Sequence, residues 1–138
     1  MNSLLDAERT AAIAYGAARE HLGELAAEFL GHEQAHARAL EKALVRLGVE
    51  PEPPRPSASY STGFPPLRSR DDAMRFALDV EETQVAAYGD SLPALFTPEL
   101  RVTVATILAT QAEHLAVLLG RLDEPQAPRD FLVGEPPE

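Results

Sequence analysis

The placement of proline constrains the fold of this chain more than any other feature. Residues 49–70 contain six prolines, whereas the alanine-rich stretches on either side carry few glycines or prolines. Proline in a helix interior removes a hydrogen bond and clashes with the preceding turn, so helices must lie on either side of this segment. With 138 residues the chain suits one domain around one hydrophobic core. We therefore expect an all-α domain in two helical halves joined by an irregular crossover.

Four segments repeat apolar residues every three or four positions, as helices with one buried face do. Gly23 separates the first two segments, and Ser69 or Asp71 is the expected N-cap of the third. Thr97 followed by Pro98 is typical of a helix start, because a hydroxyl caps the first turn and proline fits its first position. The expected helices span residues 4–22, 24–47, 71–89 and 98–122, with a crossover over 48–70 and a tail over 123–138.

The lengths of the connections predict the topology. Short connections join the first helix to the second and the third to the fourth, which favours two antiparallel hairpins. A helix of about 22 residues is about 33 Å long, and about ten extended residues of a proline-rich segment cover about 31 Å. The crossover is therefore long enough to traverse the molecule. We predict an antiparallel four-helix bundle with one long crossover between its second and third helices.

The first and third expected helices repeat one pattern. They align without gaps, and each has a glutamate seven residues before a Tyr-Gly pair: Glu8 before Tyr15, and Glu81 before Tyr88. Both glutamates fall within apolar stripes. The tyrosines are expected to be core aromatics whose hydroxyl groups reach a polar partner. The chain therefore has the pattern of a duplicated helical hairpin.

The second and fourth expected helices pair through one histidine each. His36 follows Glu33 by three residues, and His114 follows Gln111 by three residues. Positions i and i+3 share a helix face, so both pairs can point inward. A buried, unpaired carboxylate is costly, so these side chains need partners or a cation. Two divalent cations would neutralise the carboxylates and take the imidazoles as terminal ligands. His32 points about 100° away from its neighbour Glu33 and is expected at the surface.

With these residues the chain resembles the ferritin-like superfamily and, more narrowly, is similar to small bacterial ferritin-like domain proteins. The resemblance covers the four helices and extends into the tail through Ala127, Phe131 and Gly134. It implies a ferritin-like bundle with two iron or manganese ions, held by one glutamate from each of two helices and a Glu-x-x-His from each of the others. It further implies a reaction with oxygen or peroxide. The implied metal site consists of Glu8, Glu33, His36, Glu81 and His114, with Gln111 where the family has its fourth glutamate.

Gln111 is a departure from the family pattern and leaves other interpretations open. An amide is a weak, neutral ligand, so a two-metal site here would carry less negative charge. Glu33 and His36 could form a hydrogen-bonded pair without metal, Glu8 and Glu81 could lie in water at the edge of their stripes, and Gln111 could be a core amide. The alternative function is a metal-free bundle with a relict polar core that acts as a structural or binding module. A binder of a small polar molecule is a third interpretation.

Composition excludes several classes of function. The net charge is −10, from 22 acidic and 12 basic residues, so we expect no nucleic-acid partner. The absence of cysteine excludes zinc fingers, iron–sulfur clusters and thiol nucleophiles. We find neither an apolar run of about 20 residues nor a signal-peptide pattern, and therefore expect no membrane association and a cytoplasmic location. A homodimer formed through helix faces is a further prediction, whereas nothing in the sequence identifies a redox partner.

Overall fold

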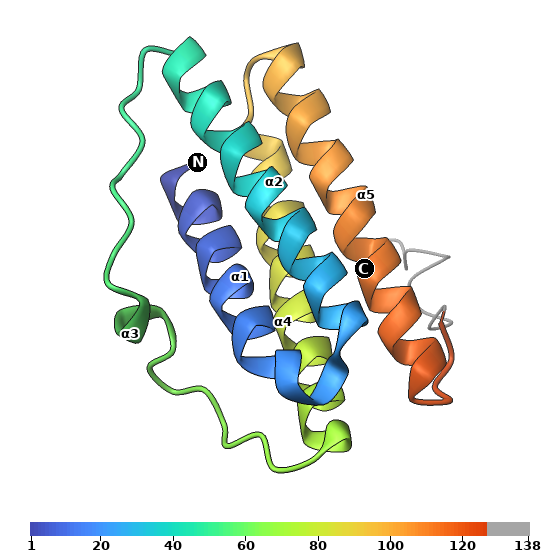
Figure 1. Cartoon of the computed structure of the whole chain (residues 1–138). Coiled ribbons are helices and arrows are strands. Elements are labelled where there is room, and N and C mark those ends of the chain that lie inside the picture. Colours follow the sequence, from blue (N-terminus) through green and yellow to red (C-terminus); the bar gives the residue numbers. More distant parts are fainter. Residues whose placement is uncertain (127–138) are drawn as a thin grey trace.

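Four long helices form an antiparallel bundle in the computed structural model, which describes residues 1–126 (Figure 1). Helix α1 pairs with α2, α4 pairs with α5, and α1 and α4 lie against one another in the bundle. The helices are α1 (Asn2–Leu22), α2 (Glu24–Arg46), α3 (Ser57–Tyr60), α4 (Arg70–Ser91) and α5 (Pro98–Arg121), with a 3-10 turn η1 (Leu92–Ala94) after α4. The predicted all-α bundle with one long crossover is confirmed. The tail residues of the family resemblance, Ala127, Phe131 and Gly134, lie outside the described residues.

Local sequence signals account for the helix ends. Gly23 has φ 59° and ψ −126°, a conformation that side chains disfavour, and it alone separates α1 from α2. Ser69, rather than Asp71, caps α4: its hydroxyl accepts a hydrogen bond from the amide of Asp72 at 3.1 Å. At the start of α5 the hydroxyl of Thr97 accepts from the amide of Leu100 at 3.4 Å.

The crossover runs along α1 and is fixed to it by specific contacts. The guanidinium of Arg55 donates to both carboxylate oxygens of Asp6, at 3.2 and 2.7 Å, and lies 4.4 Å above the ring of Tyr60. Tyr60 belongs to the short helix α3. The sequence did not predict this helix, because four residues are too few to show a helical repeat of apolar positions. Further along, Phe64 packs edge-on against Phe76 of α4 at a ring distance of 4.9 Å. The crossover therefore packs on the outside of α1 and leaves the bundle interior to the four long helices.

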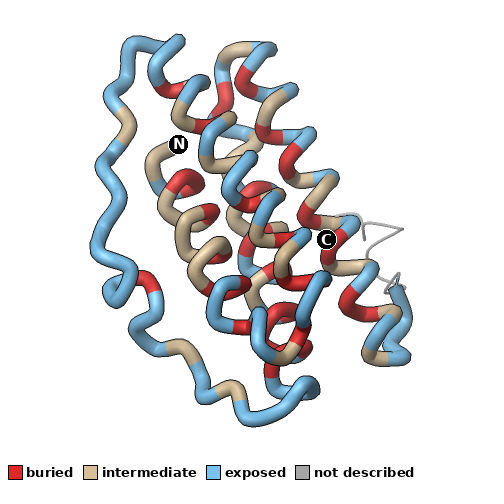
Figure 2. The backbone as a smooth tube through the Cα atoms, viewed as in Figure 1, coloured by how far each residue is buried: buried red, intermediate tan, exposed pale blue. Residues whose placement is uncertain are grey.

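The interior has two apolar clusters with polar side chains between them, and Figure 2 shows the buried positions on the inward faces of the helices. The cluster near the start of α1 includes Leu4, Leu5, Leu40, Leu44, Tyr88, Leu100, Val104 and Ile107. The cluster near the other end of the bundle includes Tyr15, Leu22, Phe29, Met74, Leu78 and Leu118. Six polar residues at mid-height separate these clusters, and we call them the polar layer: Glu8, Glu33, His36, Glu81, Gln111 and His114.

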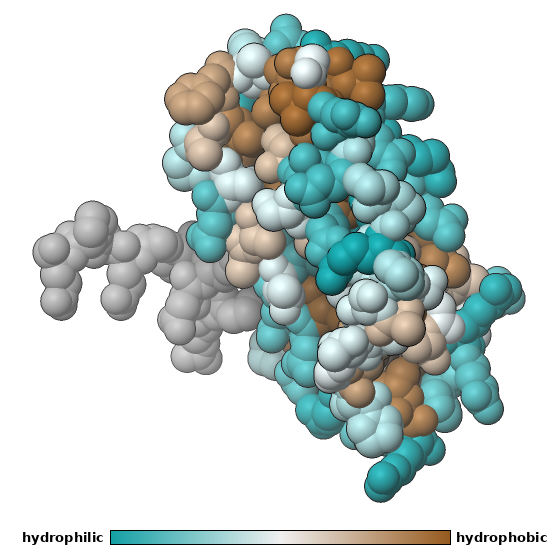
Figure 3. Space-filling model, turned by 90° about the vertical axis from the view of Figure 1, so that its left-hand side faces the viewer, coloured by the Kyte–Doolittle hydropathy of each residue, from teal (hydrophilic) through white to brown (hydrophobic). Residues whose placement is uncertain are grey.

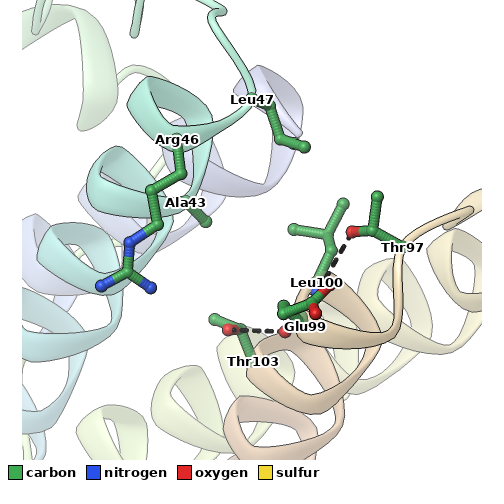
Figure 4. Close-up of a pocket in the computed structure, with 7 residues that line it drawn as sticks. All are labelled: Ala43, Arg46, Leu47, Thr97, Glu99, Leu100 and Thr103. Atoms are coloured by element: carbon green, nitrogen blue, oxygen red, sulfur yellow. Dashed lines mark hydrogen bonds between the residues drawn. The ribbon is translucent and has the colours of Figure 1, made fainter.

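One end of the bundle remains apolar on the outside. Figure 3 shows apolar side chains gathered at the upper end of the molecule, where α2 ends and α5 begins. A cavity of about 230 Å³ opens there between the two helices, and Leu47 and Leu100 face it from opposite sides (Figure 4). No residue of the polar layer lines this cavity. The large exposed apolar side chains at this end are Val45, Leu47, Val49 and Phe96.

Helix α5 is strongly apolar, although it places two polar residues in the bundle interior. Among the described residues it is the one helix that is long and apolar enough to cross a membrane, with a mean hydropathy of 1.5 in its most apolar window. Core helices of soluble proteins share this length and composition. In this chain α5 packs against α4 and α2 and turns Gln111 and His114 into the bundle interior.

Candidate metal site

The structure brings together all six residues that the sequence predicted for the site. Each of the four long helices contributes at least one of them to the polar layer. The carboxylates of Glu8, Glu33 and Glu81 are 0% exposed, so the interpretation that placed Glu8 and Glu81 in water is wrong. The side chain of His36 is 12% exposed, and that of His114 is 4% exposed. Three carboxylates thus lie in an interior that water does not reach.

Glu8, Glu33 and His36 form the first of two groups of side chains, which we call the His36 group. Nδ1 of His36 lies 3.2 Å from Oε2 of Glu8 and 3.7 Å from Oε2 of Glu33. The amide nitrogen of Gln111 donates to Oε2 of Glu33 at 3.0 Å and to Oε1 of Glu8 at 3.3 Å. Gln111 therefore bonds to the carboxylates through its NH₂ group and not through its oxygen.

Glu33, Glu81 and His114 form the second group, which we call the His114 group. Nδ1 of His114 lies 3.3 Å from Oε1 of Glu33 and 3.3 Å from Oε1 of Glu81. The ring of Phe29 stacks on the ring of His114 at 3.8 Å, with 15° between the planes. In both groups the histidine thus presents Nδ1 to two carboxylates.

Glu33 belongs to both groups and joins them. One of its oxygens faces His36 and the other faces His114. Within each group, one potential ligand atom from each residue lies within 4.8 Å of the others. This arrangement suits two neighbouring cations that share the carboxylate of Glu33.

The two tyrosines of the repeat connect the halves of the chain. The hydroxyl of Tyr88 on α4 donates to Oε1 of Glu8 on α1 at 2.5 Å. The hydroxyl of Tyr15 on α1 donates to Oε1 of Glu81 on α4. Each tyrosine therefore bonds to the glutamate of the other half, which relates α1 and α4 by an approximate two-fold symmetry.

Burial and the neighbouring groups shift the pKa values of the polar layer. Burial raises the pKa of Glu8 to about 8, with a further rise from Glu33 and an opposing effect of the hydrogen bond with His36. Burial also raises the pKa of Glu81. In Glu33 the hydrogen bonds with His114 and His36 outweigh burial and lower the pKa. The carboxylates likewise outweigh burial in the histidines and raise the pKa of His36 and of His114 to about 9. The raised pKa values of Glu8 and of the two histidines therefore both reduce the buried negative charge of the metal-free layer near neutral pH.

Protons alone do not satisfy the hydrogen-bonding capacity of the polar layer, because three of its buried oxygens lack a well-aligned donor. Oε1 of Glu33, Oε2 of Glu81 and Oε1 of Gln111 accept no well-aligned hydrogen bond within residues 1–126, although Oε1 of Glu33 lies 3.3 Å from Nδ1 of His114. Unpaired buried oxygens are costly, and carboxylates in particular are rarely left without a partner or a metal. Carboxylate oxygens and imidazole nitrogens are also the donor set that iron and manganese take in helical bundles. The residues present thus fit a carboxylate- and histidine-bound metal centre.

A comparison with known families agrees with the fold. The sequence model of the family described as "Ferritin-like domain" matches residues 4–124. The chain belongs to the ferritin-like domain family. No curated protein and no solved structure matches this ferritin-like protein with statistical significance.

Sequence reasoning missed one residue of this ferritin-like site. His32 was expected at the surface, but its Nδ1 lies 2.8 Å from Nε2 of His114. His32 does point about 100° away from Glu33 around the axis of α2, as predicted. However, α5 packs against the side of α2 that carries His32 and brings His114 next to it. Only the spacing between the two helices could have revealed this contact.

Proposed function

We propose that this ferritin-like protein binds two divalent metal ions, iron or manganese, in its polar layer and uses them to react with oxygen or peroxide. The observation that supports this most directly is the convergence of three fully buried carboxylates and two histidine Nδ1 atoms, in two groups that share Glu33. Glu8, Glu33 and His36 would hold one ion, and Glu33, Glu81 and His114 the other. When bound, iron or manganese would supply redox chemistry with dioxygen or hydrogen peroxide.

The chain's own residues would position the ligands. Tyr88 donates to Oε1 of Glu8, whose other oxygen faces His36, and Tyr15 donates to Oε1 of Glu81, the oxygen that faces His114. Metal-ligating carboxylates are commonly oriented by such outer hydrogen bonds. Binding of cations would displace the protons of the polar layer, because a ligating imidazole nitrogen must carry a lone pair.

The two apolar clusters would keep bulk water away from the site. They lie above and below the polar layer and are built from buried leucine, phenylalanine and valine side chains. His36 is the most exposed of the six residues, so its side of the layer is the shortest route for a small oxidant. A site enclosed in this way favours reaction with a molecule as small as oxygen or peroxide.

The test is iron oxidation by the protein. Chain freed of metal is loaded with Fe(II) without oxygen and then mixed with oxygen or hydrogen peroxide, while absorbance and oxygen consumption are followed. We expect oxidation well above that of Fe(II) in buffer, and loss of the excess in His36→Ala. His21→Ala is the matched control, because His21 bonds to the carbonyl of Leu67 outside the polar layer. Wild-type rates equal to buffer would contradict the proposal.

One observation supports a second candidate function, a metal-free bundle with a structural or binding role. The NH₂ group of Gln111 donates to two carboxylates, as a core amide would in a layer that holds no metal. In that case the histidines, with their raised pKa values, would remain protonated partners of the glutamates. Binding of metal in a stoichiometric, chelator-sensitive way that raises the melting temperature would count against this function.

The homodimer and the cytoplasmic location remain predictions from the sequence. The exposed apolar residues Val45, Leu47, Val49 and Phe96 are the candidates for a contact between two copies. Sedimentation of the purified protein tests the homodimer directly: a single species of one chain's mass would contradict it.

A further inference from the structure

The ring of His114 is held on three sides. Its Nδ1 faces Glu33 and Glu81, and its face stacks on Phe29. Its Nε2 lies 2.8 Å from Nδ1 of His32, with 8° between the two ring planes. The ring centroids are 5.1 Å apart, which is about the N–N distance plus two ring radii, so the imidazoles meet edge to edge. This is the geometry of a hydrogen bond directed along both rings.

A cation bound to Nδ1 of His114 would decide which of the two rings donates this hydrogen bond. The metal-bound nitrogen must carry a lone pair, so the proton of the neutral ring lies on Nε2. Nε2 of His114 then donates to Nδ1 of His32, which fixes both the tautomer and the rotation of the ligand. Such outer partners of metal-bound histidines influence metal affinity strongly.

Within residues 1–126 the His36 group has no equivalent of His32. Residue 32 directly precedes Glu33, and the residue that directly precedes Gln111 in the repeat is Thr110, whose hydroxyl donates to the carbonyl of Thr106 at 3.3 Å. The side chain of His36 is also three times as exposed as that of His114, at 12% against 4%. The two groups therefore differ in the outer hydrogen bond of the histidine and in the exposure of the histidine to water.

We propose that His32 is a positioning residue that holds His114 for metal binding and makes the His114 group the tighter of two unequal metal positions. This inference rests on the proposed metal site. The His36 group, with its more exposed histidine and no outer partner of this kind, is then the weaker position. Binding of two cations proceeds in two steps of different affinity, and the first step depends on His32.

Cobalt(II) titration tests this inference, because Co(II) needs no oxidant and its visible absorption reports its ligands. Wild type, His32→Ala, His32→Asn and His21→Ala are compared, with bound metal counted after gel filtration. Outer partners of metal-bound histidines are commonly worth about 10–100-fold in affinity, and we expect a weakening of this size for the tighter ion in His32→Ala. Asparagine places an amide oxygen near the position of Nδ1, so His32→Asn restores much of the affinity. His21→Ala binds as wild type does.

The outcomes separate this inference from the proposed function. Two ions in wild type, with the tighter one weakened in His32→Ala and recovered in His32→Asn, support both. Two ions bound with unchanged affinities in His32→Ala overturn the role of His32 and leave the metal site standing. Equal weakening in His32→Ala and His32→Asn also overturns it, because loss of packing would then explain both variants. No cobalt bound to wild type overturns the proposed site and this inference together.

Discussion

Replacement of Gln111 by glutamate is expected to lower the stability of the metal-free protein. The amide of Gln111 donates to Glu33 at 3.0 Å and to Glu8 at 3.3 Å. A hydrogen bond to a charged group contributes about 1.5–3 kcal/mol, so loss of both and addition of a fourth buried carboxyl cost at least about 3 kcal/mol. For a chain of this length that corresponds to a fall in melting temperature of roughly 10 °C. The cost is limited because the added carboxyl can take up a proton in the buried layer.

The same substitution is expected to strengthen metal binding. Two divalent ions and three carboxylates carry a net charge of about +1, and a fourth carboxylate brings the layer to about zero. We expect Gln111→Glu to bind Mn(II) at least about tenfold more tightly, which is about 1.4 kcal/mol. The assay is thermal unfolding of both proteins in chelator and in excess Mn(II), together with calorimetric titration of the metal. The melting temperature of the variant should lie below that of wild type in chelator and rise by more when metal is added.

Gln84→Glu is the matched control for this experiment. Gln84 is also buried, 2% exposed, and neither atom of its amide has a hydrogen-bond partner in the described part of the chain. It lies outside the polar layer, so Gln84→Glu should lower the melting temperature equally with and without metal. If Gln111→Glu behaves as Gln84→Glu does, or binds Mn(II) no better than wild type, the reasoning is refuted.

Three further predictions concern the rest of the polar layer. Glu33→Gln should lose both ions in elemental analysis, because Glu33 faces both groups; retention of both would contradict its shared role. Tyr88→Phe should lower the free energy of unfolding by about 1–2 kcal/mol in denaturant titrations, because it removes the hydrogen bond to Glu8, and no change would refute this. The pKa values of His36 and His114 are raised from 6.5 to about 9 on folding, so their stabilising contribution is complete below pH 6.5 and lost as the pH rises to 9. Metal-free protein should therefore unfold at lower denaturant concentrations at pH 9 than at pH 6.5, and equal or higher midpoints at pH 9 would contradict this.

The inward positions of the site were predictable because helix periodicity fixes which residues share a face. Glu8, Glu33, Glu81 and His114 lie within apolar stripes, and a residue in such a stripe becomes buried when the helices pack. The crossover was predictable for a similar reason, since six prolines cannot continue a helix. Properties of one helix at a time were thus accessible from sequence.

Contacts between helices were not predictable, because they depend on how far one helix is shifted along its neighbour. The repeat pointed to Tyr15 and Tyr88 but not to the exchange of their partners between α1 and α4. His32 lies at the edge of the buried face of α2, where the approach of α5 decides between water and His114. The helix α3 likewise packs against α1, a contact that its own four residues do not indicate. These features follow from tertiary packing.

The metal content of the purified protein decides most directly whether the polar layer is a two-metal site. Wild type, His36→Ala and His114→Ala are produced in medium that contains iron and manganese, purified without chelator and analysed for bound elements. We expect about two iron or manganese ions per wild-type chain, fewer than two in each variant, and loss of all of them to a strong chelator. Wild-type protein that carries no metal, and takes up none when iron or manganese is added, would contradict this expectation and favour the metal-free bundle.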